Sequence, residues 1–423
     1  MNPIVDSNAP SDGPPRCFLI LFYQQSFWSM GKGIGAVSFW RTPTTLAARG
    51  HEVHAVLPAE PGAPGGIEVL DGVHLHRYPC RMRFVPEYHP FLPLRLVMRA
   101  RAYLAYQRIG TRTALEIARE VRPDLVLAYG PFEAPVARRV ATAIGKPNVT
   151  RLFGNSLSLT LNDPIRFHLN FPEVRGFRTP CARLILTNDG ADGEIVARRC
   201  GVPPERFVHL RNGFDLDLFS PGPPDPSIRE RIGAPADAPL VMTVTRLAME
   251  KKLERVIDAM PALLRRVPNA IAVLVGDGPE RGALEARARN LGVTHAVRMP
   301  GPVAHRELPP WFRSAEVVLS VLDRTNASNP VVEAMACGRC VAALDAGTTR
   351  EIVIDGRTGV LIVRGDLGRL GDIVGDLLGD PERRARLGDA ARPHVRGLVL
   401  DPPARMDQEI AILQRVIEEA RPV

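Results

Sequence analysis

Arg246 and Lys251 are a pair of residues whose types and spacing suggest chemistry. They follow the apolar run 240–245, which predicts a buried strand, so they should stand at the carboxyl edge of a sheet. A guanidinium grips a phosphate with two parallel hydrogen bonds, and an ammonium adds a point charge. The pair could therefore neutralise a diphosphate without a metal ion. Solvated surface charge is the plainer alternative, because Glu250 and Lys252 adjoin Lys251.

The carboxylate residue Glu333 lies near the start of a predicted helix. Asn329 suits a helix cap and Pro330 suits the first helical position, so Glu333 should lie about one turn into a helix that Gly338 ends. Its apolar neighbours predict that it is half buried. A carboxylate in such a place accepts hydrogen bonds from the vicinal hydroxyls of a ribose, or it only interacts with the helix dipole, and spacing alone leaves both open.

A glycine-rich stretch near the amino terminus formally matches the dinucleotide fingerprint G-x-G-x-x-A over residues 31–36. The backbone N–H groups of Gly33 and Gly35 would let a phosphate approach, although a purely structural turn is the alternative. Two features argue against a nicotinamide cofactor. The glycines come several residues after the strand that ends near Tyr23, and the second strand, which ends at Leu57-Pro58, has no acidic residue placed for a ribose.

Motifs for metal or nucleotide-hydrolysing sites are missing or incomplete. No phosphate-binding G-x-x-x-x-G-K-[ST] loop occurs, and the run 51–54, His-Glu-Val-His, is not H-E-x-x-H. Asp215 and Asp217 form a D-x-D that we interpret as turn chemistry. Cys337 and Cys340 form C-x-x-C without a second ligand pair, which favours two buried thiols over zinc. We therefore expect no cofactor and no metal in the reaction.

Composition sets the broad class. The 423 residues suffice for two domains, and 45% hydrophobic with 24% charged residues is ordinary for a globular protein. The start lacks the layout of a secretory signal, so we expect a cytoplasmic protein with a loose tail over residues 1–15. The net charge of +8 suits anionic partners, though not specifically nucleic acid, which we do not expect. From Arg77 to Arg112 many arginines alternate with apolar residues, which predicts either a peripheral membrane contact or a solvated helix.

Short apolar runs alternate with helical stretches along the whole chain. Such alternation predicts parallel sheets covered on both faces, and a turn-rich segment at 220–226 divides it in two. We predict an α/β protein with two facing Rossmann-like, doubly wound domains and a cleft between them. The first domain covers residues 16–215 with a returning helix at 405–421, and the second covers 222–400. The predicted strands are 17–23, 53–57, 125–128, 148–152, 184–186, 240–245, 271–275, 297–299, 317–321 and 340–344.

Several strings together carry a family resemblance. Residues 246–252 read R-L-x-x-x-K with Lys252 where a glycine is usual, 276–279 read G-x-G-P, 301–303 read G-x-V, and 332–338 contain E-A-M-A-C-G. Residues 347–359 fit G-x-x-x-E-x-x-x-D-G-x-x-G. With the glycine loop at 33–35, this set resembles retaining glycosyltransferases of family 4, which have the GT-B fold.

The resemblance implies roles for the residues. Arg246 and Lys251 would act catalytically by holding the donor diphosphate, Glu333 would bind the ribose, and Val303 would lie near the base. Gly33 and Gly35 would approach the phosphate. Where the family usually has a second glutamate this chain has Thr325, in a segment that resembles the T-N-x-x-N-P branch. There Thr325, Asn326 and Asn329 would contact the donor as neutral groups.

The family also often has a histidine in a turn of the first domain. Residues 151–155 resemble that turn, but Phe153 stands there and no histidine occurs. The sequence therefore predicts transfer of a hexose-like sugar from a nucleoside diphosphate sugar, with retention, to a glycan, lipid-linked or small-molecule hydroxyl. Three alternatives stay open: a catalytically weak sugar-nucleotide binding protein, an epimerase or phosphorylase of the same fold, and a nicotinamide oxidoreductase.

Overall fold

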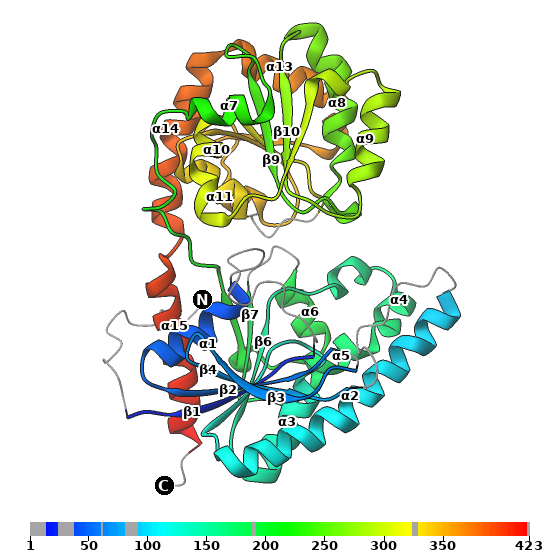
Figure 1. Ribbon diagram of the computed structural model, residues 1–423, viewed down its shortest axis with the longest axis vertical. Helices are drawn as coiled ribbons and strands as arrows, with labels where there is room; N and C mark the ends of the chain where they lie inside the picture. The colour runs from blue at the N-terminus through cyan, green and yellow to red at the C-terminus, as the bar shows by residue number, and fades with distance from the viewer. Residues whose placement is uncertain are drawn as a thin grey trace. The chain divides into compact units, whose positions relative to one another are not determined.

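The computed structural model describes residues 14–23, 38–60, 62–80, 92–187, 192–323 and 329–420 (Figure 1). These residues form two compact units. The first holds the described residues up to Asn212 and those from Pro403 onward, and the second holds Gly213–Pro402. The fold class predicted from the sequence is confirmed, because each unit is a mostly parallel sheet with helices on its faces. Most of the predicted tail lies outside the described residues.

The first unit contains an eight-stranded sheet of order β3-β4-β2-β1-β5-β6-β7-β8. All neighbouring strands run parallel except β3, which pairs antiparallel with β4 at one edge. The central strands are apolar on both faces because helices cover both. The strands are β1 (Cys17–Leu21), β2 (Glu52–Pro58), β3 (Gly66–Leu70), β4 (Val73–Tyr78), β5 (Leu125–Ala128), β6 (Asn148–Leu152), β7 (Arg183–Thr187) and β8 (Phe207–Leu210).

Helix α2 is a 30-residue element, and the sequence predicted only parts of it. Arginines interrupt the apolar periodicity that would indicate its buried side. The α-helices of the first unit are α1 (Ser38–Ala48), α2 (Leu92–Val121), α3 (Ala134–Ile144), α4 (Pro164–Leu169), α5 (Phe171–Arg178), α6 (Gly193–Arg199) and α15 (Pro402–Glu419). Two short 3-10 turns, η1 (Leu157–Thr160) and η2 (Pro204–Arg206), join them.

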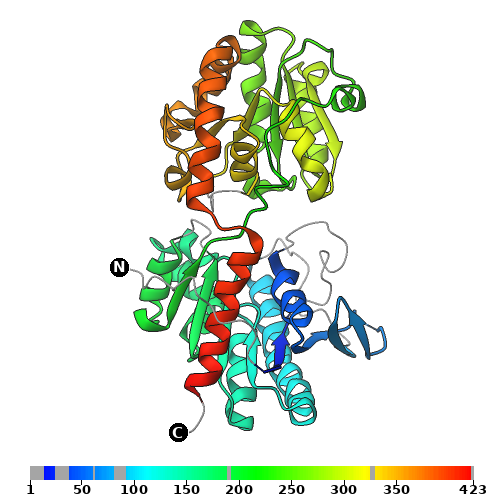
Figure 2. The ribbon, with the colours of Figure 1, turned by 90° about the vertical axis from the view of Figure 1, so that its left-hand side faces the viewer.

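Helix α15 belongs to the first unit and lies along its sheet (Figure 2). A fully buried carboxylate, Glu409, fixes it there. Glu409 accepts hydrogen bonds from Arg405 Nη2 at 2.6 Å, Arg151 Nε at 3.2 Å and Thr42 Oγ1 at 3.0 Å. Burial alone would raise the pKa of Glu409, but the two guanidinium groups hold it below its usual range. Arg151, in the turn where the family often has a histidine, thus has a structural role.

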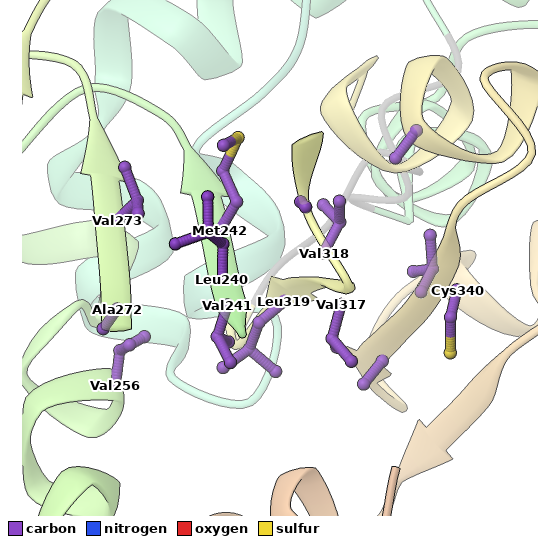
Figure 3. Packing of buried hydrophobic residues seen from close by; sticks show 14 of the residues in the cluster. Leu240, Val241, Met242, Val256, Ala272, Val273, Val317, Val318, Leu319 and Cys340 are labelled. Carbon is purple, nitrogen blue, oxygen red and sulfur yellow. The ribbon is translucent and has the colours of Figure 1, made fainter. Parts of the chain in front are cut away.

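The second unit contains a six-stranded, all-parallel sheet of order β11-β10-β9-β12-β13-β14. Apolar side chains of β9, β10, β12 and β13 fill its core (Figure 3). The order reverses between β9 and β12, which is the arrangement of a doubly wound nucleotide-binding sheet. The strands are β9 (Leu240–Val244), β10 (Ile271–Val275), β11 (Val297–Gly301), β12 (Val317–Ser320), β13 (Cys340–Leu344) and β14 (Val360–Ile362).

Four of the described helices of the second unit, α7, α12, α13 and α14, were not predicted from the sequence. Glycines interrupt the pattern of α13, yet Gly371 is needed because a side chain there would meet the backbone of α8. The α-helices are α7 (Pro226–Ile232), α8 (Glu254–Arg266), α9 (Arg281–Asn290), α10 (Leu308–Ser314), α11 (Asn329–Ala336), α12 (Thr349–Ile352), α13 (Leu370–Gly379) and α14 (Pro381–Leu398). The 3-10 turns are η3 (Met249–Lys251), η4 (Thr294–Ala296), η5 (His305–Glu307) and η6 (Arg364–Arg369).

The two unpaired thiols of the C-x-x-C motif are buried, as predicted. Cys340 is the first residue of β13, and Cys337 lies between the end of α11 and that strand. Burial raises the pKa of Cys337 to about 12 and that of Cys340 to about 11, so neither thiol ionises near neutral pH. Gly338 between them has a φ of +70° and ends α11, also as predicted.

Candidate functional site

The carboxyl edge of the second sheet gathers most of the described candidate residues. Arg246 and Lys251 follow β9, Val303 follows β11, and the segment after β12 leads into α11 with Asn329 and Glu333. In an open parallel sheet, ligands bind at this edge and beside the point where the strand order reverses. Gly33, Gly35, Thr325 and Asn326 lie outside the described residues, so their predicted roles stay predictions.

Backbone hydrogen bonds join the loops that follow β9, β10 and β11. Leu247 N donates to Asp277 O at 2.9 Å, Glu280 N donates to Leu247 O at 3.0 Å, and Gly276 N donates to Gly301 O at 2.9 Å. The segments that carry Arg246 and Val303 are therefore held to a common frame, the turn 276–279.

The two glycines of this turn are sterically required. A β-carbon placed on Gly276 would lie 1.9 Å from the carbonyl oxygen of Thr245, and one on Gly278 would lie 2.3 Å from that of Leu247. Real β-carbons do not approach a carbonyl oxygen so closely, so any side chain would push the loops apart. The glycines of the G-x-G-P string thus allow two backbone segments to pack closely, which the spacing alone did not reveal.

Arg246 and Lys251 are positioned differently from each other. The Arg246 side chain is exposed, and its Nη2 donates to Glu250 Oε1 at 2.5 Å. Lys251 ends the short turn η3 and is half buried. Burial lowers the pKa of Lys251, Glu250 acts in the opposite direction, and Arg246 lowers it further. An ammonium held in this way gains more from an incoming anion than a fully solvated one.

Lys252 occupies a backbone conformation that normally calls for glycine. Its φ is +55°, in the left-handed region, where a side chain costs about 1–2 kcal/mol. This explains why a glycine is usual at this position of the family motif. Its 3.7 Å ion pair with Glu254 is partly exposed and contributes little in return.

Glu333 is almost fully buried on α11, with 4% of its surface exposed. Helix α11 begins at Asn329, one residue earlier than predicted, and Asn329 is exposed. His305, in turn η5 directly after the Gly301–Val303 segment, has its Nε2 2.8 Å from Glu333 Oε1. An ionised carboxylate only accepts hydrogen bonds, so Nε2 carries the proton in this pair. The arrangement orients one carboxylate oxygen, and the part of the chain that the structure describes gives the other oxygen no hydrogen-bond donor.

His305 is the site residue that sequence reasoning missed. Its ring centroid lies 5.1 Å from that of the buried Phe219, which steadies the imidazole from one side. No motif marks it, and its only sequence signal is its position two residues after Val303. The contact to Glu333 depends on a fold that brings the end of β11 beside α11.

The carboxyl edge of the first sheet presents aromatic groups and one buried acid. Phe153, after β6, stacks on Phe39 with ring centroids 3.9 Å apart, and the Arg151 guanidinium lies 4.4 Å over its ring. Glu133, after β5, accepts a hydrogen bond from Tyr23 N at 2.5 Å, and burial raises its pKa to about 7. This carboxyl changes its protonation near neutral pH, which its sequence surroundings did not signal.

Comparison with known proteins now decides the family. The family described as Glycosyl transferases group 1 matches residues 224–394, and the one described as Glycosyltransferase Family 4 matches residues 37–218. A GDP-mannose-dependent alpha-(1-6)-phosphatidylinositol monomannoside mannosyltransferase of Mycolicibacterium smegmatis is 32% identical over 62% of this chain and 75% of its own length. The chain belongs to glycosyltransferase family 4.

A second relative and a solved structure are also similar to this family 4 glycosyltransferase. A D-inositol 3-phosphate glycosyltransferase of Xylanimonas cellulosilytica is 34% identical over 52% of this chain, which spans only 54% of that relative's length. A sucrose-phosphate synthase structure from Thermosynechococcus elongatus matches with a TM-score of 0.71 over 96% of this chain and 100% of its own, at 20% identity. That likeness confirms the GT-B fold. Separately, within the described residues no helix is long and apolar enough to cross a membrane.

Proposed function

We propose that this glycosyltransferase moves a hexose-like sugar from a nucleoside diphosphate sugar to an acceptor hydroxyl, with retention of the anomeric configuration. The observation that carries the proposal is the His305–Glu333 pair at 2.8 Å, at the edge where the strand order reverses. Glu333 accepts from the ribose hydroxyls, Val303 lies near the base, and Asn329 with Thr325 and Asn326 contacts the sugar. The GDP-mannose dependence of the mycobacterial relative supports this donor class.

The transfer step follows from charge. As the bond from the anomeric carbon to the diphosphate breaks, negative charge builds on the departing phosphate oxygens. Arg246 and Lys251 stabilise that charge, and the loop frame set by Gly276 holds them in place before the reaction begins. A donor phosphate oxygen takes the acceptor proton, as is implied by the family. The proposed reaction therefore needs neither a metal nor a pair of carboxylates, and the backbone of Gly33 and Gly35 assists at the phosphate.

We also propose a lipid-linked acceptor and a peripheral membrane contact through the Arg77–Arg112 region. The α2 part of this region exposes Leu94, Val97 and Leu104, with 42%, 55% and 59% of their surfaces accessible. Arg101 and Arg108 are exposed at helical spacing from them, so basic and apolar groups share one face. Such a face suits an anionic membrane. The phosphatidylinositol monomannoside substrate in the relative's name supports this class of acceptor over a free glycan.

The role of Glu333 is tested with a ligand that lacks one hydroxyl. Wild type should bind GDP or UDP more tightly than the 2′-deoxy analogue, and Glu333→Gln should weaken binding of the ribonucleotide about 10- to 100-fold, since a hydrogen bond to a charged group contributes roughly 1.5–3 kcal/mol. The variant should no longer distinguish the two ligands. Isothermal titration measures both, and Glu382→Gln, an exposed glutamate of the first turn of α14, is the matched control.

If Glu333→Gln keeps the wild-type preference for the ribonucleotide, the ribose role is wrong. Release of nucleoside diphosphate that depends on added acceptor separates a transferase from a catalytically weak binding protein. The weak-binding alternative predicts the same affinities with no such release.

The role of Lys251 is tested by pH. Only the ammonium attracts a diphosphate, and burial lowers the pKa of Lys251, so nucleoside diphosphate affinity should be full at low pH and should fall as pH rises through this lowered pKa. Lys251→Arg keeps its charge throughout and should flatten this part of the profile. Affinities of both proteins are measured from about pH 7 to about pH 10. The ligand's own ionisation affects both profiles equally, so the difference between them reports Lys251. Identical profiles would contradict the assignment.

The membrane contact is tested on vesicles of phosphatidylcholine with and without phosphatidylinositol. The double variant Arg101→Ala, Arg108→Ala should lower the partition coefficient on the anionic vesicles about 30-fold, because each basic residue near such a surface contributes about 1 kcal/mol. Arg289→Ala with Arg386→Ala removes the same charge from exposed positions on α9 and α14 and should change binding little. If both double variants lose the same vesicle affinity, net charge rather than this face of α2 causes the binding, and the proposed contact is wrong.

A further inference from the structure

A second group of ligand-type side chains lies at the opposite end of the first sheet, where its strands begin. Cys17 is the first residue of β1, and Glu52 is the first residue of β2, paired with it in register. His54 comes two residues after Glu52 on the same strand, so both side chains lie on one face of it. A thiol sulfur, a carboxylate oxygen and an imidazole nitrogen from these three residues all lie within 4.8 Å of one another.

We propose that Cys17, Glu52 and His54 form a zinc site. Thiolate, imidazole and carboxylate are the ligand types that Zn²⁺ takes, at about 2.0–2.3 Å each. The thiolate disfavours Mg²⁺ and Ca²⁺, which require oxygen ligands. Three protein ligands leave a fourth position for water. Glu52 is exposed, so that position opens to solvent, while Cys17 and His54 are buried.

The surroundings of His54 prepare its ring for a metal. Its Nδ1 lies 2.9 Å from His76 Nε2, and its Nε2 lies 2.9 Å from Glu52 Oε1. When Nδ1 carries the proton and donates it to His76, Nε2 presents a lone pair on the Glu52 side. A second partner that fixes the tautomer in this way is the usual companion of a metal-binding histidine. The ring of His74 stacks on His54 at 5.0 Å and holds its plane.

The local charge also favours a cation. Cys17 Sγ donates to Val121 O at 3.5 Å, at the carboxyl end of α2, where the helix dipole is negative. The Asp124 carboxylate lies beside the same residue and accepts from Cys17 N at 3.0 Å, and Lys146 Nζ, 3.5 Å from this carboxylate, offsets part of its charge. Before binding, His54 Nε2 carries the proton that it donates to Glu52. On binding, His54 gives this proton to solvent and takes one at Nδ1, so its imidazole stays neutral. The thiol also gives its proton to solvent, sulfur turns from Val121 to the ion, and Glu52 Oε1 moves off Nε2 to bind beside it. No electron is transferred.

The three ligands come from strands rather than loops, so the site is built on rigid backbone. It lies at the amino ends of the strands, whereas the proposed transfer chemistry uses carboxyl ends. The zinc is therefore a structural or regulatory ion for the first unit, and its presence does not make the transfer reaction metal-dependent.

The test is metal binding by the full-length protein. After chelation, incubation with Zn²⁺ and dialysis of the excess, wild type should retain one Zn²⁺ by elemental analysis. Co²⁺ in its place should give a thiolate-to-cobalt charge-transfer absorption. Cys17→Ser should lose that absorption. His76→Gln, which removes only the orienting partner, should weaken binding about 10- to 100-fold. Cys200→Ser, another buried thiol of the first unit, should keep both properties.

Glu52→Gln provides a variant whose folding is not at risk, because Glu52 is exposed. It should weaken Zn²⁺ binding with an unchanged circular dichroism spectrum. The proposal is overturned if wild type binds no stoichiometric metal, or if Cys17→Ser and Glu52→Gln bind it as wild type does. A hydrogen-bonded Glu52–His54–His76 chain without metal affinity would then be the correct description of this cluster.

Discussion

The close approach of two backbone segments in the second unit is the constraint on which the candidate site depends. Gly276 and Gly278 lie against the carbonyl groups of Thr245 and Leu247 at distances that no side chain allows. This contact fixes the path of the chain after β9, and the hydrogen bond from Gly276 to Gly301 extends the frame to the end of β11. Three loops far apart in sequence thereby become one surface, and catalysis by positioned charge requires such a preformed surface.

Within that frame the chemistry rests on one buried charge. A carboxylate that is removed from water needs partners, and the described residues supply Glu333 with His305 at 2.8 Å. A ligand that brings hydroxyl donors completes the hydrogen bonding of this carboxylate. Arg246 and Lys251, by contrast, lie where a phosphate can reach them, one exposed and the other half buried. In the proposed mechanism, the second unit thus separates ribose recognition from diphosphate stabilisation.

Much of the fold was readable from the sequence because the strands are short apolar runs between helical patterns. The strands 125–128, 148–152, 271–275 and 340–344 were predicted with the bounds observed. Other described elements were not predicted, since packing rather than a periodic pattern stabilises them: the strands β3, β4, β8 and β14 and the helices α4, α5, α7, α12, α13 and α14. Glycines at helix contacts, as at Gly371, look like helix breakers until the neighbouring helix is known.

The candidate site was readable only in part. The residue types at 246, 251 and 333 suggested phosphate and ribose binding, whereas His305 and Glu133 carry no local signal because their roles arise from contacts across the fold. The histidine cluster around His54 was likewise invisible as a cluster, since pairing between β2 and β4 creates it.

Hydrogen–deuterium exchange of the full chain with and without a saturating nucleoside diphosphate tests the central claim most directly. If these loops form one ligand surface, exchange should slow in peptides that cover 245–252, 276–280 and 301–306. Ligand binding that leaves exchange in all three segments unchanged would contradict the account.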